Sequence, residues 1–256
     1  MDTPEFSPAL GKRNPPVPDT LRGREIVLAG GTGGLGSPTL ELLAAEGARL
    51  VVSYRSNRER AELWRNQVEL VQADLAVPAD RERILAAAPK LYGLVVFAGD
   101  PARAVAGADL QTIMLRSHEA NYLGPILLAR EASERMRASG TPGSIVLMGT
   151  MQAVALFPGS TTYASQKAAL VQAARILARE CRGPANIRVN VVSPGVIAAG
   201  MAEASISSGK YDRYLQEKVI HRFGHAQDMA RAVRFLLEPD NYVTGQVLSV
   251  DGGITL

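Results

Sequence analysis

From Arg24 onward, short apolar runs alternate with segments whose apolar residues recur at helical spacing. The runs are rich in β-branched residues and nearly continuous, which is typical of strands buried on both faces of a sheet. The predicted strands are Ile26–Ala29, Leu50–Ser53, Val68–Val71, Leu94–Ala98, Ser144–Met148, Ile187–Val192 and Gln246–Val250. The predicted helices between them are Thr39–Ala45, Asp80–Ala87, Ala120–Met136, Ala164–Arg179 and Asp228–Leu237.

This alternation of strand and helix favours a parallel sheet with right-handed crossovers. We predict an α/β fold: a Rossmann-like, doubly wound parallel sheet of about seven strands with helices on both faces. No internal repeat or second boundary is visible after residue 23, so residues 23–256 are expected to form one domain. Residues 1–22 contain five prolines and few apolar side chains, which predicts a flexible tail or linker.

The composition is ordinary for a soluble globular protein, with 46% apolar and 21% charged residues. The net charge of +3 comes mainly from arginines scattered among acidic residues. Because no basic run with interleaved aromatics occurs, nucleic acid is not an expected partner. The charge-free stretch 142–166 is broken by proline and glycine, so no membrane span is predicted.

Cysteine and histidine usage narrows the chemistry further. Cys181 is the only cysteine, so no internal disulfide is possible and a reducing, cytoplasmic location is expected. The three histidines, His118, His221 and His225, have no acidic partner at a ligand spacing. We therefore predict no metal site.

The first predicted strand runs directly into a glycine-rich segment, residues 29–36 (AGGTGGLG), which a helix follows. Glycines at such a junction permit a tight turn and let the backbone approach a pyrophosphate resting on the helix N-terminus. The segment fits both G-x-G-x-x-G and G-x-x-x-G-x-G, and its position between strand and helix makes either reading informative. The candidate cofactor-binding residues here are Gly30, Thr32, Gly33, Gly34, Leu35 and Gly36.

The second strand is followed by residues 53–58 (SYRSNR), where an NAD site would place an acidic residue about 20 positions after the glycines. No acid stands there, whereas Arg55 and Ser56 can bind a ribose 2′-phosphate through charge-assisted hydrogen bonds. A solvated surface arginine is the alternative interpretation of Arg55. We predict NADP (NADPH) as the cofactor, with further contacts after the third and fourth strands from Asp74, Leu75, Ala98 and Gly99.

Tyr163 and Lys167 stand four residues apart in a predicted helix and therefore share one face of it. A nearby cation favours the phenolate, which tunes a tyrosine as a general acid or base near neutral pH. Such a pair also occurs by chance in many helices, so its meaning depends on the neighbouring motifs.

Taken in chain order, these features resemble the short-chain dehydrogenase/reductase family. The resemblance covers residues 22–256 and also rests on Asn121, on Thr150 thirteen residues before Tyr163, and on Pro194-Gly195. The C-terminal segments 222–224 (RFG) and 243–253 are similar to the ends of β-ketoacyl-carrier-protein reductases.

The resemblance implies that Tyr163 donates a proton to a substrate carbonyl. It implies that Lys167 holds the nicotinamide ribose and keeps the tyrosine acidic, and that Asn121 anchors a water in a proton relay. Thr150 stands where the family usually has serine, and its extra methyl group would narrow the pocket. The further cofactor contacts implied by the family pattern are Tyr163, Lys167, Pro194, Gly195 and Ile197.

Residues near this predicted site suggest where a substrate binds. Met151 and Gln152 are the preferred substrate contacts, with Met148, Phe157 and Met201 as further apolar candidates, although each could equally be core. In the family the segment corresponding to residues 199–223 forms a substrate lid, with Gly200 and Gly209 as possible hinges here. The Ala-rich helix from Ala164 is expected at the interface of a homodimer or homotetramer.

We therefore predict an NADPH-dependent ketoreductase acting on a small-molecule ketone. Thr150, Phe97 and the turn at residues 100–103 (DPAR) suggest divergence toward polyketide tailoring, for instance in aromatic angucycline-type pathways. Two alternatives stay open: a fatty-acid-type β-ketoacyl-carrier-protein reductase and a non-catalytic dinucleotide-sensing regulator.

Overall fold

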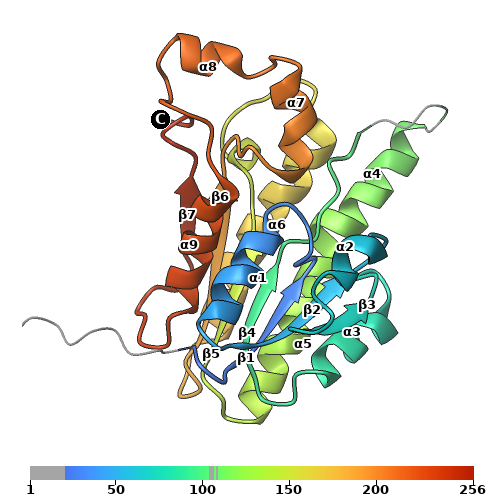
Figure 1. Cartoon of the computed structure of the whole chain (residues 1–256), viewed down its shortest axis with the longest axis vertical. Coiled ribbons are helices and arrows are strands. Elements are labelled where there is room, and N and C mark those ends of the chain that lie inside the picture. The colour runs from blue at the N-terminus through green and yellow to red at the C-terminus, as the bar shows by residue number, and fades with distance from the viewer. Residues whose placement is uncertain (1–20, 104–106, 108) are drawn as a thin grey trace, which may run out of the picture.

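The computed structural model describes residues 21–103, 107 and 109–256 (Figure 1). The predicted tail, residues 1–22, lies outside the described residues except for Leu21 and Arg22. Leu21 is fully buried against the hydrophobic cluster that contains Ile26 and Leu28. The packed part of the chain thus includes Leu21, two residues before the predicted domain start.

A parallel sheet forms the centre of the described chain, and its seven strands run in the order β3-β2-β1-β4-β5-β6-β7. The predicted doubly wound fold is therefore confirmed. The fourth strand begins at Leu91 and ends at Val96, earlier at both ends than the prediction. The strands are β1 Glu25–Ala29, β2 Arg49–Tyr54, β3 Glu69–Gln72, β4 Leu91–Val96, β5 Gly143–Met148, β6 Ile187–Pro194 and β7 Val247–Val250.

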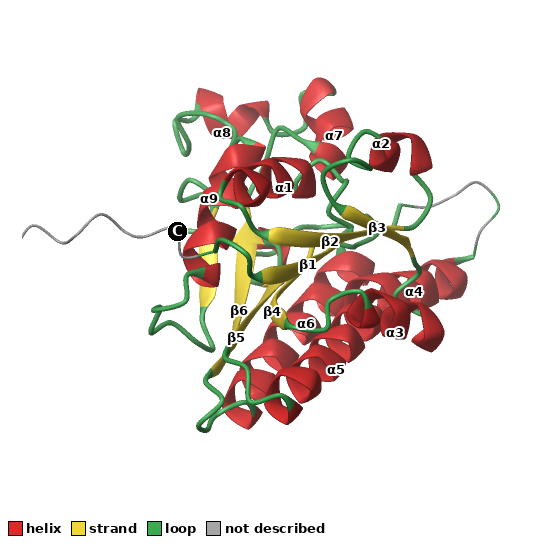
Figure 2. Cartoon of the chain, turned by 60° about the horizontal axis from the view of Figure 1, so that its bottom comes forward, coloured by secondary structure: helices red, strands yellow, loops and turns green. Residues whose placement is uncertain are grey.

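Helices cover both faces of this sheet, as Figure 2 shows. The longer ones follow the predicted segments, whereas α2, α4, α7 and α8 were not predicted. The helices are α1 Gly36–Ala45, α2 Arg58–Glu62, α3 Pro78–Ala86, α4 Leu110–His118, α5 Gly124–Ala138, α6 Thr161–Glu180, α7 Glu203–Ser207, α8 Asp212–Gln216 and α9 Ala226–Leu237. Short turns of other types are η1 Glu119–Leu123 (π), η2 Met151–Ala153 and η3 Gly200–Ala202 (both 3-10).

Two hydrophobic clusters, one on each face, hold the layers together. In β1, Val27 and Ala29 join the cluster with α3, α5 and α6, while Ile26 and Leu28 join the cluster with α1 and α9. This division follows from the strand geometry, since successive side chains point to opposite faces. Both faces are covered, so β1, β4 and β5 are buried along their whole length and read as continuous apolar runs.

The helix predicted from Ala120 is interrupted in the structure. α4 ends at His118, a π turn spans Glu119–Leu123, and α5 then begins at Gly124. A π turn inserts one extra residue into the helical ladder, and apolar periodicity does not reveal it. This turn carries Asn121, whose side chain is fully buried.

The carboxyl ends of the parallel strands meet at one edge of the sheet, where ligands bind in folds of this type. The glycine segment follows β1, Arg55 follows β2, and Thr150 follows β5 at this edge. The segment carrying α7 and α8 also lies there, at the top of Figure 1. In the described part of the chain no helix is long and apolar enough to cross a membrane.

Candidate active site

A cleft of about 1050 Å³ opens at this edge of the sheet. It brings together every residue predicted for cofactor binding or catalysis except Asn121 and Lys167, which are buried behind its wall. The predicted residues that line it are Gly30, Thr32, Gly33, Gly34, Leu35, Gly36, Arg55, Ser56, Asp74, Leu75, Ala98, Gly99, Thr150, Tyr163, Pro194, Gly195 and Ile197.

The glycine turn at the cleft wall is too tight for side chains. Gly30 has a φ of +75°, and a Cβ atom there would lie 2.8 Å from the Ala98 amide nitrogen. A Cβ on Gly36 would lie 2.5 Å from the Gly31 carbonyl oxygen. The N-cap of α1, Leu35, makes no side-chain capping bond, so the start of this helix faces the cleft uncapped. An uncapped helix N-terminus favours an anion through its backbone N–H groups and dipole.

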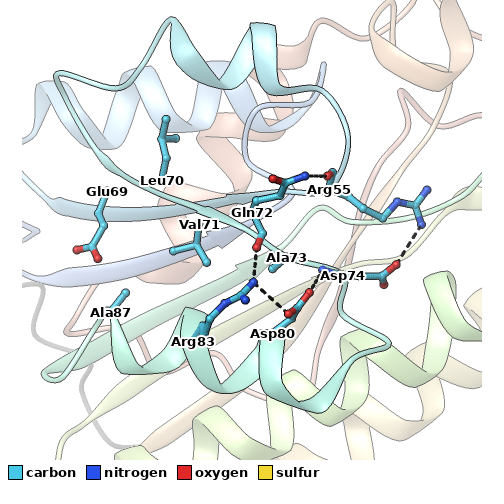
Figure 3. Close-up of a pocket in the computed structure, with 10 residues that line it drawn as sticks. All are labelled: Arg55, Glu69, Leu70, Val71, Gln72, Ala73, Asp74, Asp80, Arg83 and Ala87. Atoms are coloured by element: carbon cyan, nitrogen blue, oxygen red, sulfur yellow. Dashed lines mark hydrogen bonds and ion pairs between the residues drawn. The ribbon is translucent and has the colours of Figure 1, made fainter.

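Arg55 and Asp74 both line the cleft. Figure 3 shows the two side chains beside each other at the border of a smaller hollow. Its guanidinium stands 4.0 Å from an Asp74 carboxylate oxygen, and its side chain is 56% exposed. The Arg55 carbonyl accepts a 3.1 Å bond from Gln72, which anchors the backbone while the side chain stays at the surface. A second hollow of about 660 Å³ adjoins the same two residues on the β3 edge. An exposed pair at this distance is weak, so the guanidinium is available to a stronger anion.

Tyr163 and Thr150 form a hydrogen-bonded pair in the cleft. Tyr163 lies in the first turn of α6, and Thr150 directly follows the last residues of β5. Burial of the hydroxyl raises the pKa of Tyr163 to about 12, although the hydrogen bond with Thr150 lowers it. The phenol is therefore fully protonated at neutral pH.

Lys167 lies one helical turn below Tyr163 and is only 3% exposed. Its Nζ donates a 2.9 Å hydrogen bond to the Met148 carbonyl oxygen, and burial lowers its pKa to about 8. We expected this cation to make Tyr163 more acidic. In the structure the opposite shift prevails, because burial of the phenol dominates and the ammonium is directed at Met148.

Asn121 clamps the loop that follows β4. Its Nδ2 donates to the Asp100 carbonyl oxygen at 2.8 Å and to Ser117 Oγ at 3.1 Å, and its Oδ1 accepts from the Asp100 amide at 3.0 Å. We expected this residue to anchor a water of a proton relay. Its amide hydrogens are both bonded to protein atoms, so the side chain shapes the Gly99–Asp100 loop, and the role in a proton relay stays a prediction.

The segment 199–223, predicted as a lid, closes one side of the cleft. Gly200 and Gly209, the suggested hinges, have φ values of +58° and +74°. A Cβ on Gly34 would lie 2.6 Å from the Gly200 amide nitrogen, so the glycine turn and the lid are in close contact. Met201 lines the cleft and its carbonyl oxygen accepts a 2.7 Å bond from Arg103.

The predicted substrate contacts Met151, Gln152 and Phe157 also line the cleft, whereas Met148 packs into the core below it. Sequence reasoning did not single out two further lining residues, Arg103 and Tyr211. No motif marks either position. The only sequence signal is that Arg103 belongs to the loop after β4 and Tyr211 to the predicted lid.

Comparisons with known proteins identify the family. The family described as "Enoyl-(Acyl carrier protein) reductase" matches residues 30–255. The chain is 32% identical over 240 residues to a 3-oxoacyl-[acyl-carrier-protein] reductase of Mus musculus, covering 89% of this chain and 96% of the relative. It is 29% identical over 268 residues to NADPH-dependent aldehyde reductase 2 of Arabidopsis thaliana, covering 95% and 97%.

Solved structures agree with this assignment. A short-chain dehydrogenase/reductase from Serratia marcescens superimposes with a TM-score of 0.81 at 27% identity, covering 93% of this chain and all of the other. The chain belongs to the short-chain dehydrogenase/reductase family, as its motifs indicated, and it is an oxidoreductase of that family.

Members of this family use a nicotinamide dinucleotide, and the cleft has the features that such a cofactor needs. At Gly99, a Cβ atom would stand 3.0 Å from Asn121 Oδ1 and 3.7 Å from Lys167 Nζ. The missing side chain thus keeps open the space next to the buried ammonium, where a ribose would bind. The uncapped start of α1 suits the pyrophosphate at the other end of the same cleft.

Proposed function

We propose that this protein is an NADPH-dependent ketoreductase that reduces a substrate carbonyl with Tyr163 as the proton donor. The observation that carries the proposal is the hydrogen-bonded pair of Tyr163 and Thr150, which faces the cleft that also holds the glycine turn. The relatives support it, since they are named as reductases of aldehydes and 3-oxoacyl groups.

The bound dinucleotide supplies the hydride, which is chemistry that protein side chains cannot provide. Tyr163 and Thr150 would donate hydrogen bonds to the carbonyl oxygen, and the Tyr163 proton would pass to that oxygen as negative charge develops. With its pKa near 12, the phenol holds this proton throughout the neutral range. Lys167, buried and adjacent to the space at Gly99, would hold the ribose hydroxyls.

NADPH is the preferred cofactor because Arg55 and Ser56 line the far end of the cleft. Arg55 would exchange its weak contact with Asp74 for the ribose 2′-phosphate. The planar guanidinium can donate two parallel hydrogen bonds to this doubly charged anion. The Arabidopsis relative, named as NADPH-dependent, is consistent with this choice.

For the substrate we propose a ketone of polyketide tailoring. Thr150 and Phe97 line the cleft. At these two positions the residues differ from those usual in the family, so the shape of the substrate pocket differs as well. A carrier-bound 3-oxoacyl substrate of fatty-acid type is the second candidate, favoured by the name of the mouse relative. We further propose a cytoplasmic homodimer or homotetramer with α6 at one interface, no metal requirement, and a linker role for residues 1–22.

The test is NADPH oxidation, followed at the nicotinamide absorbance band, with purified protein and a panel of ketones. We expect turnover by the wild type and a loss of 10²- to 10⁴-fold in kcat for Tyr163→Phe, since that is the usual contribution of a general acid. The variant should bind NADPH as the wild type does. Tight NADPH binding without turnover of any ketone would support the dinucleotide sensor instead.

A further inference from the structure

One phenol in the cleft has no part in the proposed reaction. Tyr211 stands in the lid between α7 and α8 and is 8% exposed, with its ring packed in a cluster with Met151 and Val196. Its charge state is coupled electrostatically to Tyr163 on one side and to Arg103 on the other. Tyr211 also lines the same cleft as Tyr163 and Arg103.

Three cations line the same cleft as this phenol. Arg103 comes from the loop after β4, while Lys210 and Arg213 flank Tyr211 in the lid, and all three line the cleft. The Lys210 ammonium stands 5.6 Å from the centre of the Tyr211 ring, and the Arg213 guanidinium 4.8 Å from that of Tyr214. Contact with an aromatic face holds a cation in place without pairing its charge with an anion.

No carboxylate among the described residues forms an ion pair with these three cations. Glu217, one turn beyond Arg213, acts on it only from a longer distance. By contrast, Arg55 at the other end of the cleft faces Asp74 at 4.0 Å. Solvated surface cations are the simpler interpretation of any one of the three. Because all three line one cleft together with the buried Tyr211, this end of the cleft combines positive charge with a hydrogen-bond donor.

Building on the proposed ketoreductase function, we infer that the substrate carries an acidic oxygen group, a carboxylate or a phosphate, in addition to its carbonyl. Tyr211 donates a hydrogen bond to this group, and Arg103, Lys210 and Arg213 neutralise its charge. The carbonyl then lies at Tyr163 and Thr150, with the acidic group directed to the lid. Tyr211 thus acts as a specificity-determining residue rather than a proton donor.

The experiment compares two matched substrate pairs under the wild-type enzyme and NADPH. One pair is 4-oxopentanoate and its methyl ester, and the other is the acetoacetyl thioester of phosphopantetheine and that of N-acetylcysteamine. The pair with the larger preference identifies carboxylate or phosphate as the group. We expect kcat/KM for the charged member to exceed that for the neutral member about tenfold in at least one pair, the size expected for a hydrogen bond to a charged group.

Variants assign this preference to the named residues. Tyr211→Phe and Lys210→Gln should each lower kcat/KM for the charged substrate more than for the neutral one, the first by about tenfold more. Lys218→Gln is the matched control, because Lys218 is an exposed cation of the same lid that does not line the cleft. Equal rates for both members of both pairs, or a preference that survives both variants, would overturn the inference.

A binding measurement separates this inference from the proposed reaction. Calorimetry with NADP present measures the affinity of the protein for 4-oxopentanoate and for free phosphopantetheine. At least one of the two should bind to the wild type more tightly than it binds to the Tyr211→Phe variant. If no ketone is turned over but this difference is found, the ketoreductase proposal fails and the acidic-group site stands. If turnover occurs and binding is indifferent to Tyr211, the site fails and the reductase stands.

Discussion

Lys167 carries its positive charge in a part of the protein from which water is excluded. Burial of this charge lowers the free energy of unfolding by an amount that can be measured. Its side chain is 3% exposed, and burial lowers its pKa from 10.5 to about 8. One pKa unit corresponds to about 1.4 kcal/mol, so the protonated lysine destabilises the folded state by about 3 kcal/mol at neutral pH.

Replacing Lys167 with methionine keeps a long unbranched side chain and removes the charge. The variant loses the hydrogen bond to the Met148 carbonyl oxygen, which is worth about 1.5 kcal/mol because its donor is charged. We therefore expect Lys167→Met to be more stable than the wild type by about 2 kcal/mol at pH 7, or roughly 4–8 °C in Tm. It should at the same time be inactive, since a charge kept at a cost in stability is typical of a functional site.

The pH dependence follows from the sign of the shift. The folded-state pKa lies below the unfolded one, so the destabilisation is complete below pH 8 and disappears as the pH rises to 10.5. The stability difference between variant and wild type should therefore shrink by about 2 kcal/mol between pH 7 and pH 9.5.

Urea unfolding followed by circular dichroism, at one protein concentration and without dinucleotide, measures this difference. Lys90→Met is the control, because Lys90 is exposed and should show no such pH dependence. The reasoning is refuted if Lys167→Met is less stable at pH 7, or if its difference from the wild type is the same at both pH values.

Substitutions at three further positions test the cofactor and catalytic residues. Arg55→Ala should weaken NADPH binding at least about tenfold in a fluorescence titration and leave NADH binding unchanged; equal losses would exclude a contact with the 2′-phosphate. Gly99→Ala places a methyl group 3.0 Å from Asn121 Oδ1 and 3.7 Å from Lys167 Nζ and should weaken binding of both dinucleotides about tenfold; unaltered binding would show that the ribose lies elsewhere. Thr150→Ala should lower kcat about 10²- to 10³-fold, as loss of one donor to a developing oxyanion does, and Thr150→Ser should restore it; failure of serine to do so would count against the hydroxyl.

Most of the fold was predictable because the sheet is buried on both faces. Strands such as β1 and β5 have no polar face, so they stand out as short β-branched runs between helical segments. The short helices α7 and α8 were missed, since five residues each are too few to show a period. The π turn at Glu119–Leu123 was missed because its neighbours on both sides are regular helix.

The candidate site was predictable as far as local motifs reach. Residue type and spacing over a few positions were enough to predict three features as parts of the site: the glycine segment, Arg55 and the Tyr163–Lys167 pair. The pKa of Tyr163 could not be predicted in the same way. Spacing places the two on one helical face, but the balance between burial and charge depends on what packs around them.

By itself, the sequence determined the fold class, the family and the residues that can transfer a proton, because these depend on local pattern. The tertiary structure alone decided that Asn121 clamps the loop at Asp100 and that Lys167 is buried against Met148. It also brought Arg103 and Tyr211, over 100 residues apart in the chain, to the cleft that Tyr163 lines. Desolvation and electrostatic coupling act through space, so only the packed chain shows which charges and hydroxyls face one substrate.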